Sequence, residues 1–301
     1  MLFSKDSLTF EQQIDRLIER GLQVEDKQNA TAYLSHINYY RLGTYWWSFI
    51  EDHETHTFKT GATFNQVLNL YVFDRELRLL LLDAIERIEV SLRTQWAFHL
   101  SKTYGPHAHL DKEAFMRKFD HQGFIDNLQT EIKRTSDKNI KNQAYKYEEP
   151  TPAIWIICEV MSFGWLSRSF DSVARRSLRA DISDTYKLKE VVLSSFLHHI
   201  TTVRNICAHH SRLWNREFTF TMKLPTNGEQ NLLHSFNKGS PKQLYNTMVM
   251  CAYLMDIISP NNHWKQKLKM LIESHNINAV DMGFPIDWLQ RDMWANALIK
   301  T

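Results

Sequence analysis

The chain has 301 residues, of which 43% are hydrophobic and 23% charged, so it can bury a large core and is not intrinsically disordered for most of its length. Glycine (9) and proline (7) are too few to form the many turns of a β-sandwich or barrel, and this composition predicts a mostly helical globular protein. The net charge of only +2 excludes the overall basic excess of a protein that coats nucleic acid. Any anionic partner must therefore meet a local basic patch.

Cysteine usage and the N-terminal sequence indicate a soluble protein. Cys158, Cys207 and Cys251 lack the close spacing of a disulfide or zinc framework and lie among apolar neighbours, so we expect buried, reduced thiols. The N-terminus carries charges where a signal peptide needs an apolar stretch. The longest uncharged apolar-rich run, at 243–255, is shorter than the roughly 20 residues that span a bilayer. We expect a cytoplasmic location and no membrane contact.

The N-terminal 60 residues predict one helix and, after an aromatic segment, a polar loop. Residues 8–22 have helical periodicity, with Leu17, Ile18 and Leu22 expected inside and Gly21 expected to end the helix. The acidic, His-bearing segment 51–64 predicts an irregular loop or a short hairpin that turns at 59–61. Its carboxylates and histidines lack the spacing of a metal site, and we expect neither a metal nor a cofactor.

Large aromatic residues gather around Arg41 in the segment between these two elements, namely Tyr39, Tyr40, Tyr45, Trp46 and Trp47. Aromatic rings beside an arginine are typical of surfaces on which single-stranded bases stack. They are also the commonest fillers of cores and interfaces, and the core interpretation is favoured. Within this group, Arg41 is the residue that we expect to contact an RNA phosphate.

The strongest periodic signal lies at 64–103, which predicts one long helix, straight or kinked, of up to about 60 Å. Thr63 is the expected N-cap. The expected buried face carries seven apolar residues at helical spacing, Leu70, Leu77, Leu81, Ala84, Ile85, Ile88 and Leu92. The opposite face carries Arg75, Glu86, Glu89 and Arg93.

The rest of the chain predicts further helices. Residues 107–149 are polar and predict a mobile excursion with one helix, after which Pro152 suits the first turn of a buried helix at 153–170. Within that helix Glu159 should pair with an arginine, since a buried carboxylate is costly alone. Another helix is expected at about 185–216, and three shorter ones at 242–258, 262–275 and 286–299.

A helical wheel of 198–218 separates a polar, basic face from a core face. At about 100° per residue, His209, Arg212 and Arg216 fall within about 40° of Asn205. Arg204 lies at the border, about 140° from His209, and only its long side chain could bring the two heads together. The wheel places His210 on the inward face. Replacing His210 should therefore act through stability.

Arginines around a histidine suit phosphoryl chemistry. Guanidinium groups hold phosphate oxygens and stabilise charge that develops in a transition state, while imidazole can transfer a proton near neutral pH. On RNA the 2′-hydroxyl next to the phosphate supplies the nucleophile, so neither a metal nor a protein nucleophile is needed. An arginine-rich, solvated helix face with one incidental histidine is the alternative, and the wheel alone favours it.

The segment Arg204-Asn205-Ile206-Cys207-Ala208-His209 resembles the R-x4-H motif of HEPN-superfamily ribonucleases. More narrowly, the chain resembles the Abi family of bacterial abortive-infection proteins, of the AbiD/AbiF type. The resemblance rests on five ordered blocks that span most of the chain, INYYRLGTYWWSF (37–49), FDRELRLLLLDAIERIEVSLR (73–93), PAIWIICEVMSFGWLS (152–167), RNICAHHSRLWNREF (204–218) and MGFPIDW (282–288).

This resemblance implies an all-α, HEPN-like helical bundle with N- and C-terminal helical elaborations. It implies one unit over 1–301, with an N-terminal lobe (1–60), a HEPN core (61–222) and C-terminal helices (223–301). It also implies a metal-independent endoribonuclease of phage defence, in which Arg204 and His209 are catalytic and Asn205 orients them. HEPN enzymes generally form homodimers in which two such motifs face one cleft.

Further residues are candidates for support and for RNA binding. Glu86, Glu89 and Arg93 could orient Arg204 or set the protonation of His209, although a surface ion pair between Glu89 and Arg93 is the alternative. Candidates for RNA contact are Arg212, Arg216, Arg41 and the basic run Arg168, Arg175, Arg176 and Arg179.

RNA, including a small structured non-coding RNA, is the expected partner. Base readout in DNA is not expected, because no helix offers a base-reading arrangement for a major groove. The competing functional hypothesis is a non-catalytic RNA-binding or interaction module of a defence or toxin–antitoxin-like system.

Overall fold

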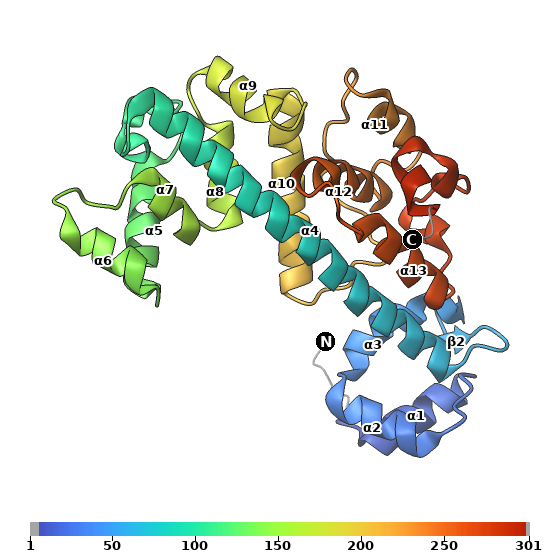
Figure 1. Cartoon of the computed structure of the whole chain (residues 1–301). Helices are drawn as coiled ribbons and strands as arrows, with labels where there is room; N and C mark the ends of the chain where they lie inside the picture. Colours follow the sequence, from blue (N-terminus) through green and yellow to red (C-terminus); the bar gives the residue numbers. More distant parts are fainter. Residues whose placement is uncertain (1–5, 299–301) are drawn as a thin grey trace. The chain divides into compact units, whose positions relative to one another are not determined.

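The computed structural model describes residues 6–298, and α-helices dominate this range (Figure 1). Thirteen α-helices and one two-stranded antiparallel sheet lie within the described residues, which confirms the predicted all-α class. The chain divides into two compact units. Two helices, α4 (Phe64–Tyr104) and α13 (Trp264–Ser274), each contribute residues to both units.

The first unit consists of Met1–Arg78 and Met270–Asn278. It contains α1 (Phe10–Glu19), α2 (Lys27–His36), α3 (Tyr39–Trp46) and the start of α4. A capping box between Thr9 and Gln12 begins α1, and Gly21, at φ +94°, follows its end as predicted. Leu17 and Leu22 are buried, but the prediction for Ile18 is wrong. Ile18 is 42% exposed because α1 buries the face that carries Ile14 and Leu17.

A hairpin follows α3, formed by β1 (Ile50–Asp52) and β2 (Thr57–Phe58). Its reversal lies at 53–56 and not at 59–61, so the predicted position of the turn is wrong. The carboxylate of Asp52 accepts a hydrogen bond from the backbone N–H of Glu54 at 2.8 Å, and His56 adopts a positive φ of 58°. An aspartate that binds the backbone two residues later is a turn signal in its own right.

The aromatic segment is partly core and partly surface. Tyr45 and Trp46 are buried, which confirms the core interpretation for these two residues, whereas Tyr40 is 76% and Trp47 48% exposed. The Tyr45 hydroxyl donates a hydrogen bond to Asp74 at 2.7 Å, and Asp74 also pairs with Arg78. Burial, followed by the charge of Asp74, raises the pKa of Tyr45, so this phenol stays protonated and keeps donating.

The long helix α4 confirms the periodic pattern of the sequence. Thr63 and Gln66 form a reciprocal capping box, with N–H to side-chain distances of 3.1 and 3.0 Å. The 41 residues that follow form one continuous helix, about 60 Å long at 1.5 Å per residue. All seven apolar residues of its predicted inner face are buried. A continuous apolar stripe of this length holds packing partners along the whole helix.

The second unit consists of Leu79–Lys269 and Ala279–Thr301. Besides the rest of α4 and the start of α13 it contains α5 (His121–Arg134), α6 (Lys138–Lys146), α7 (Ile154–Ile157), α8 (Phe163–Asp171), α9 (Arg176–Asp184), α10 (Glu190–Ala208), α11 (Gln230–Ser235) and α12 (Tyr245–Ile258). Within this unit the second half of α4 interacts with Arg204 of α10 through Glu89 and with the Met161 carbonyl, just before α8, through Arg93. No helix of the described residues is both long and apolar enough to cross a membrane.

The polar segment 107–149 contains two α-helices, α5 and α6, where the sequence predicted one. Helix α5 buries Phe124, Ile125, Leu128 and Ile132 on one face. Before it, a 3-10 turn at Ala108–Leu110 places His109 in the core, where its Nε2 lies 2.6 Å from the Thr151 hydroxyl. The high polar content reflects the outer faces of two amphipathic helices.

The buried helix expected at 153–170 is interrupted. Helix α7 tightens into a 3-10 turn at Cys158–Val160, the chain is extended at Met161, and α8 begins after Ser162. The Ser162 hydroxyl accepts from the backbone N–H of Trp165 at 3.3 Å and so caps α8. Because the chain leaves the helical path here, the Met161 carbonyl is available to a side chain of another element.

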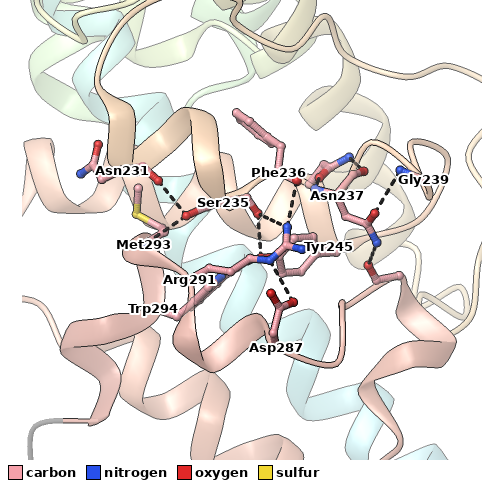
Figure 2. A network of polar contacts seen from close by, with 12 residues as sticks. Asn231, Ser235, Phe236, Asn237, Gly239, Tyr245, Asp287, Arg291, Met293 and Trp294 are labelled. Carbon is pink, nitrogen blue, oxygen red and sulfur yellow. Dashed lines mark hydrogen bonds and ion pairs between the residues drawn. The ribbon is translucent and has the colours of Figure 1, made fainter.

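The C-terminal part of the second unit is held by a polar network around Ser235 (Figure 2). The Ser235 carbonyl accepts from the Tyr245 hydroxyl at 2.8 Å, and the Ser235 hydroxyl accepts from the backbone N–H of Met293 at 3.0 Å. Arg291 joins this network to Asp287 at 3.1 Å. The network fixes the segment 282–288, which carries the last of the five sequence blocks.

Gly283 limits the conformation of this C-terminal segment. Gly283 has φ +82°, and a Cβ there would lie 2.7 Å from the Gln243 Cβ, so only glycine fits.

The α-helix expected at 286–299 is wrong in type. The described part forms 3-10 turns, at Trp288–Gln290 and Asp292–Leu298, with i to i+3 bonds such as Trp294 N–H to the Arg291 carbonyl. Residue 299 lies outside the described residues.

The buried His109 predicts a loss of stability in acid. Burial lowers the pKa of His109 to about 3, from a usual value of about 6.5. Between these values the unfolded chain binds a proton that the folded chain does not, so the free energy of unfolding falls as the pH drops, by up to about 1.4 kcal/mol per pH unit. In His109→Gln this contribution is absent, and its stability should depend less on pH. Denaturant unfolding at pH 7, 6 and 5 measures the two slopes; equal slopes would contradict the prediction.

Candidate functional site

The R-x4-H motif lies at the C-terminal end of α10, which ends at Ala208 and not near residue 216 as predicted. The Ser211 N–H bonds to the Ile206 carbonyl at 3.0 Å and the His210 N–H to the Cys207 carbonyl at 3.1 Å. These two bonds form a Schellman motif, in which the residue after the cap is left-handed. The last residue of the helix is therefore Ala208, and His209, which ends the motif, is the C-cap.

The residue in the left-handed position is His210, with φ 56°. Its side chain is exposed, so the prediction that His210 points into the core is wrong. The helical wheel assumed a continuous helix through 218, and it fails once the chain reverses at His210. For the same reason Arg212 and Arg216 are not on the face of α10. They follow it in an irregular segment that turns at 214–215, where Arg216 Nη1 donates to the Arg212 carbonyl at 3.1 Å.

Arg204 and the other two motif residues have different surroundings. Asn205 and His209 are exposed, whereas Arg204 is half-buried. Arg204 Nη1 lies 3.5 Å from Asn205 Oδ1, a long hydrogen bond. No hydrogen bond joins Arg204 to His209 among the described residues. In one copy of the chain the His209 imidazole and the Asn205 amide are thus exposed, while the Arg204 guanidinium is half-buried.

The carboxylate that interacts with Arg204 belongs to Glu89 of α4. Glu89 interacts electrostatically with both Arg204 and Arg93, and its Oε1 lies 2.5 Å from Arg93 Nη2. Loss of solvent raises the pKa of Glu89, and the charges of Arg93 and then Arg204 oppose that rise. A half-buried carboxylate between two guanidinium groups keeps its charge mainly through them. Of the predicted supporting residues, the structure brings Glu89 and Arg93 to Arg204.

Glu86, the third predicted supporting residue, is exposed on α4 and has no hydrogen bond or ion pair within residues 6–298. Glu86 and Glu89 are three residues apart, which places them on neighbouring sides of the helix. A role for Glu86 stays a prediction.

Arg93 has two further partners at the site, and the first of them, the Met161 carbonyl, was not predicted. Arg93 Nη2 donates to the Met161 carbonyl at 2.7 Å, and Arg93 Nη1 lies 3.4 Å from Glu159 Oε2. Glu159 thus pairs with an arginine as predicted, but its side chain is 54% exposed and not buried. The Met161 carbonyl is available only because the helix breaks before Ser162. The signal in the sequence is the serine N-cap, which a continuous helical pattern on both sides obscures.

The predicted RNA-binding arginines have separate locations. Arg41 is exposed on α3 of the first unit, and Arg168 is exposed on α8 of the second. Arg168 lies over the Trp165 ring at 3.9 Å, Arg175 over the Tyr104 ring at 5.1 Å, and Arg176 Nε lies 2.5 Å from Glu190 Oε1. Arg179 donates to the Val173 carbonyl. The basic run is therefore divided among stacking, ion pairing and backbone contacts.

The thiols are buried as predicted, and none of the three cysteines forms a disulfide. Burial raises the pKa of Cys158 to about 12, so this thiol stays protonated and is a poor nucleophile. Within the described residues no three His, Cys, Asp or Glu side chains gather as a metal site would need.

This is an all-α chain that presents an R-x4-H motif at the C-terminal end of a helix, with a carboxylate–guanidinium cluster behind its arginine. The chain belongs to the Abi-like protein family, whose profile matches residues 32–215, more than half of the 301 residues. The match includes Arg204, Asn205 and His209, and it supports a role in abortive infection. No curated protein and no solved structure matches the chain.

The left-handed His210 predicts a difference between two truncations. Both His210→Gly and His210→Ala remove the imidazole, but only alanine carries a Cβ that is strained at φ 56°. We expect His210→Gly to be more stable than His210→Ala by about 1 kcal/mol. Denaturant unfolding of the two variants measures this difference. Equal stability, or a more stable alanine variant, would show that the C-terminus of α10 is not left-handed at this residue.

Proposed function

We propose that the protein is a metal-independent endoribonuclease of the HEPN type that acts in abortive infection, with Arg204 and His209 as its catalytic pair. The observation that carries this proposal is the separation of roles at the end of α10. His209 and Asn205 face solvent, where a phosphate can reach them, and Arg204 is positioned beside Glu89. A solvated face with an incidental histidine would not need a half-buried arginine with a half-buried carboxylate partner.

In the proposed reaction the 2′-oxygen of a ribose attacks the adjacent phosphorus, and the bond from phosphorus to the 5′-oxygen of the next nucleotide breaks. His209 moves a proton between the 2′-hydroxyl, its own ring and the leaving 5′-oxygen, as a general acid–base. Arg204 stabilises the charge on the non-bridging phosphate oxygens through charge-assisted hydrogen bonds. The products are a 2′,3′-cyclic phosphate and a 5′-hydroxyl. Asn205 positions the guanidinium through its side-chain oxygen.

The active form that we propose is a homodimer. The chain contains one R-x4-H motif, and its histidine is exposed at the helix end, where a second copy could add its own arginine and histidine. Two motifs around one phosphate supply two imidazoles, so one can accept a proton while the other donates one. A single copy must use one ring for both tasks.

The proposed chemistry predicts the effect of the motif variants. His209→Ala should lower the cleavage rate of RNA by about 10²–10⁴-fold, because general acid–base catalysis contributes about that much. Arg204→Lys keeps a positive charge beside Glu89 but lacks the planar fork, and should lower the rate by about 10²-fold or more. The measurement is the rate at which wild type and variants cleave a labelled structured RNA in excess EDTA.

A matched control is His36→Ala, which removes an exposed histidine at the end of α2 and should retain the wild-type rate. Thermal melting checks that each variant is folded. Wild-type cleavage that chelator abolishes, or undiminished cleavage by His209→Ala, would overturn the ribonuclease proposal.

The dimer proposal predicts a concentration dependence. Sedimentation at concentrations where RNA is cleaved should give the mass of two chains, and dilution below the dimer dissociation constant should reduce the specific activity. Mixing wild type with excess His209→Ala should reduce activity per wild-type chain, because hybrid sites lack one imidazole. A monomer that cleaves RNA with an unchanged specific activity on dilution would contradict this prediction.

A further inference from the structure

A hollow of about 560 Å³ lies in the second unit, beside the part of α10 that precedes the R-x4-H motif. It is formed by α8, the first half of α10, the segment before α5 and the segment after Phe218. Its volume is within the usual range for small-ligand sites, about 300–1,000 Å³. The side chains that matter for its chemistry are Lys118, Trp165, Arg168, His198, Phe220 and Lys223.

The hollow and the motif lie along the same pair of helices. Helices α8 and α10 pack antiparallel, because Gly164 at the start of α8 lies against Thr201, and Asp171 at its end accepts from the Ser194 hydroxyl at 2.5 Å. The Met161 carbonyl, which binds Arg93 near the motif, directly precedes α8. The helix pair therefore connects the surroundings of Arg204 to the hollow.

The helical repeat gives the direction and spacing. At about 100° per residue, Ser194 and His198 fall within about 20° of Asn205, so they share a face of α10. The rise of about 1.5 Å per residue puts His198 about 10 Å along that face from Asn205. A strand whose phosphate lies at the motif would meet the hollow if it continued along α10 toward its N-terminus.

Two pairs of planar side chains line the hollow, one stacked and one edge-to-face. The Arg168 guanidinium lies 3.9 Å over the centre of the Trp165 ring, and the His198 ring meets Phe220 edge-on at 4.5 Å. Single-stranded RNA is held by bases that stack on aromatic rings and guanidinium planes. Arg168 is exposed and Trp165 is half-buried, so the guanidinium presents its flat face to solvent while the indole ring beneath holds it in place.

The charges of the hollow favour an anion. Of the acidic groups there, Glu190 pairs with Arg176, while Asp120 accepts from the Gly123 N–H and Asp171 from the Ser194 hydroxyl, and these two keep their charges. Against these two carboxylates the lining carries Lys118, Arg168, Arg179 and Lys223, so positive charge is in excess. Of these cations, Lys118, Arg168 and Lys223 form no ion pair within the described residues. Cations without a carboxylate partner are the groups that bind phosphate oxygens.

We propose that this hollow binds one nucleotide of single-stranded RNA, with its base against Arg168 and Trp165 and its phosphate near Lys118 and Lys223. It is a subsite for the strand whose scissile phosphate lies at Arg204 and His209, and in that respect it rests on the proposed function. It gives the enzyme a preference for an unpaired nucleotide beside the cleaved bond, because a base in a duplex cannot stack on a side chain.

Binding of a non-cleavable strand tests the subsite apart from the chemistry. The probe is a fluorescent, 2′-O-methylated, unstructured RNA of ten nucleotides, and the readout is its anisotropy with the full-length protein. We expect Arg168→Gln to weaken binding about tenfold, because the base loses its stacking partner, and Lys223→Gln to lower the slope of log K against log salt by about one, because a phosphate contact is lost. The matched control is Arg134→Gln, which removes an exposed arginine of α5 outside the hollow and should change affinity less than twofold.

A second pair of variants tests stacking. Trp165→Leu should weaken binding about as much as Arg168→Gln, whereas Trp155→Leu, at an exposed tryptophan of α7 outside the hollow, should not. If Arg168→Gln and Trp165→Leu bind the probe as tightly as their controls, the proposal is wrong. If free adenosine monophosphate binds as tightly as the ten-nucleotide strand, the hollow takes a free nucleotide, which also overturns the proposal.

Cleavage assays separate this proposal from the proposed function. A wild-type protein that cleaves RNA, with an Arg168→Gln variant that has an unchanged KM and probe affinity, would remove the subsite and leave the ribonuclease. A wild-type protein that cleaves nothing, with the predicted loss of probe affinity in Arg168→Gln, would remove the ribonuclease and leave an RNA-binding hollow.

Discussion

The guanidinium of Arg93 connects the elements on which the candidate site depends. It binds Glu89 one turn earlier on α4 and the carbonyl of Met161 between α7 and α8. Of its carboxylate contacts, the one with Glu89 dominates, because that pair is about 15% exposed while Glu159 is 54% exposed and screened by water. Since Glu89 also interacts with Arg204, the break that starts α8 and the arginine of the motif depend on the same ion pair.

The way in which α10 ends explains how His209 can be exposed while Arg204 of the same helix is half-buried. If α10 continued past Ala208, the following turns would extend along its axis beyond His209. The Schellman motif instead turns the chain away at His210 and leaves His209 as the last residue of the helix. The cost is a non-glycine residue at φ 56°, and such strain is found where surrounding contacts hold it in place.

The sequence predicted most features that follow from spacing along one helix, and it missed the end of one helix and a contact between two others. Thr63, the length of α4 and its buried face follow from local spacing, and all were predicted. The end of α10 was not, because no glycine or proline marks it, although histidine is among the residues that tolerate a positive φ. The break at Met161 and the partners of Arg93 need α4 and α8 to be packed together, and no local pattern encodes that contact. The three motif residues were found by their spacing, but their separate surroundings were not.

The near-zero net charge of the chain is compatible with a local anion site, because ion pairs compensate some of the arginines of the second unit and leave other cations free to bind an anion. Glu190 neutralises Arg176, and Glu89 is shared by Arg93 and Arg204, so these arginines add little positive charge to the surface. Lys118, Arg168 and Lys223 have no such neutralising partner within the described residues, and they converge on one hollow. Within the basic run, an ion pair thus compensates Arg176, while Arg168 keeps its positive charge at the hollow, where aromatic rings are also present. If the hollow binds RNA as proposed, it does so through a few defined contacts, and the net charge of +2 avoids the unspecific attraction that an overall basic surface exerts on every nucleic acid.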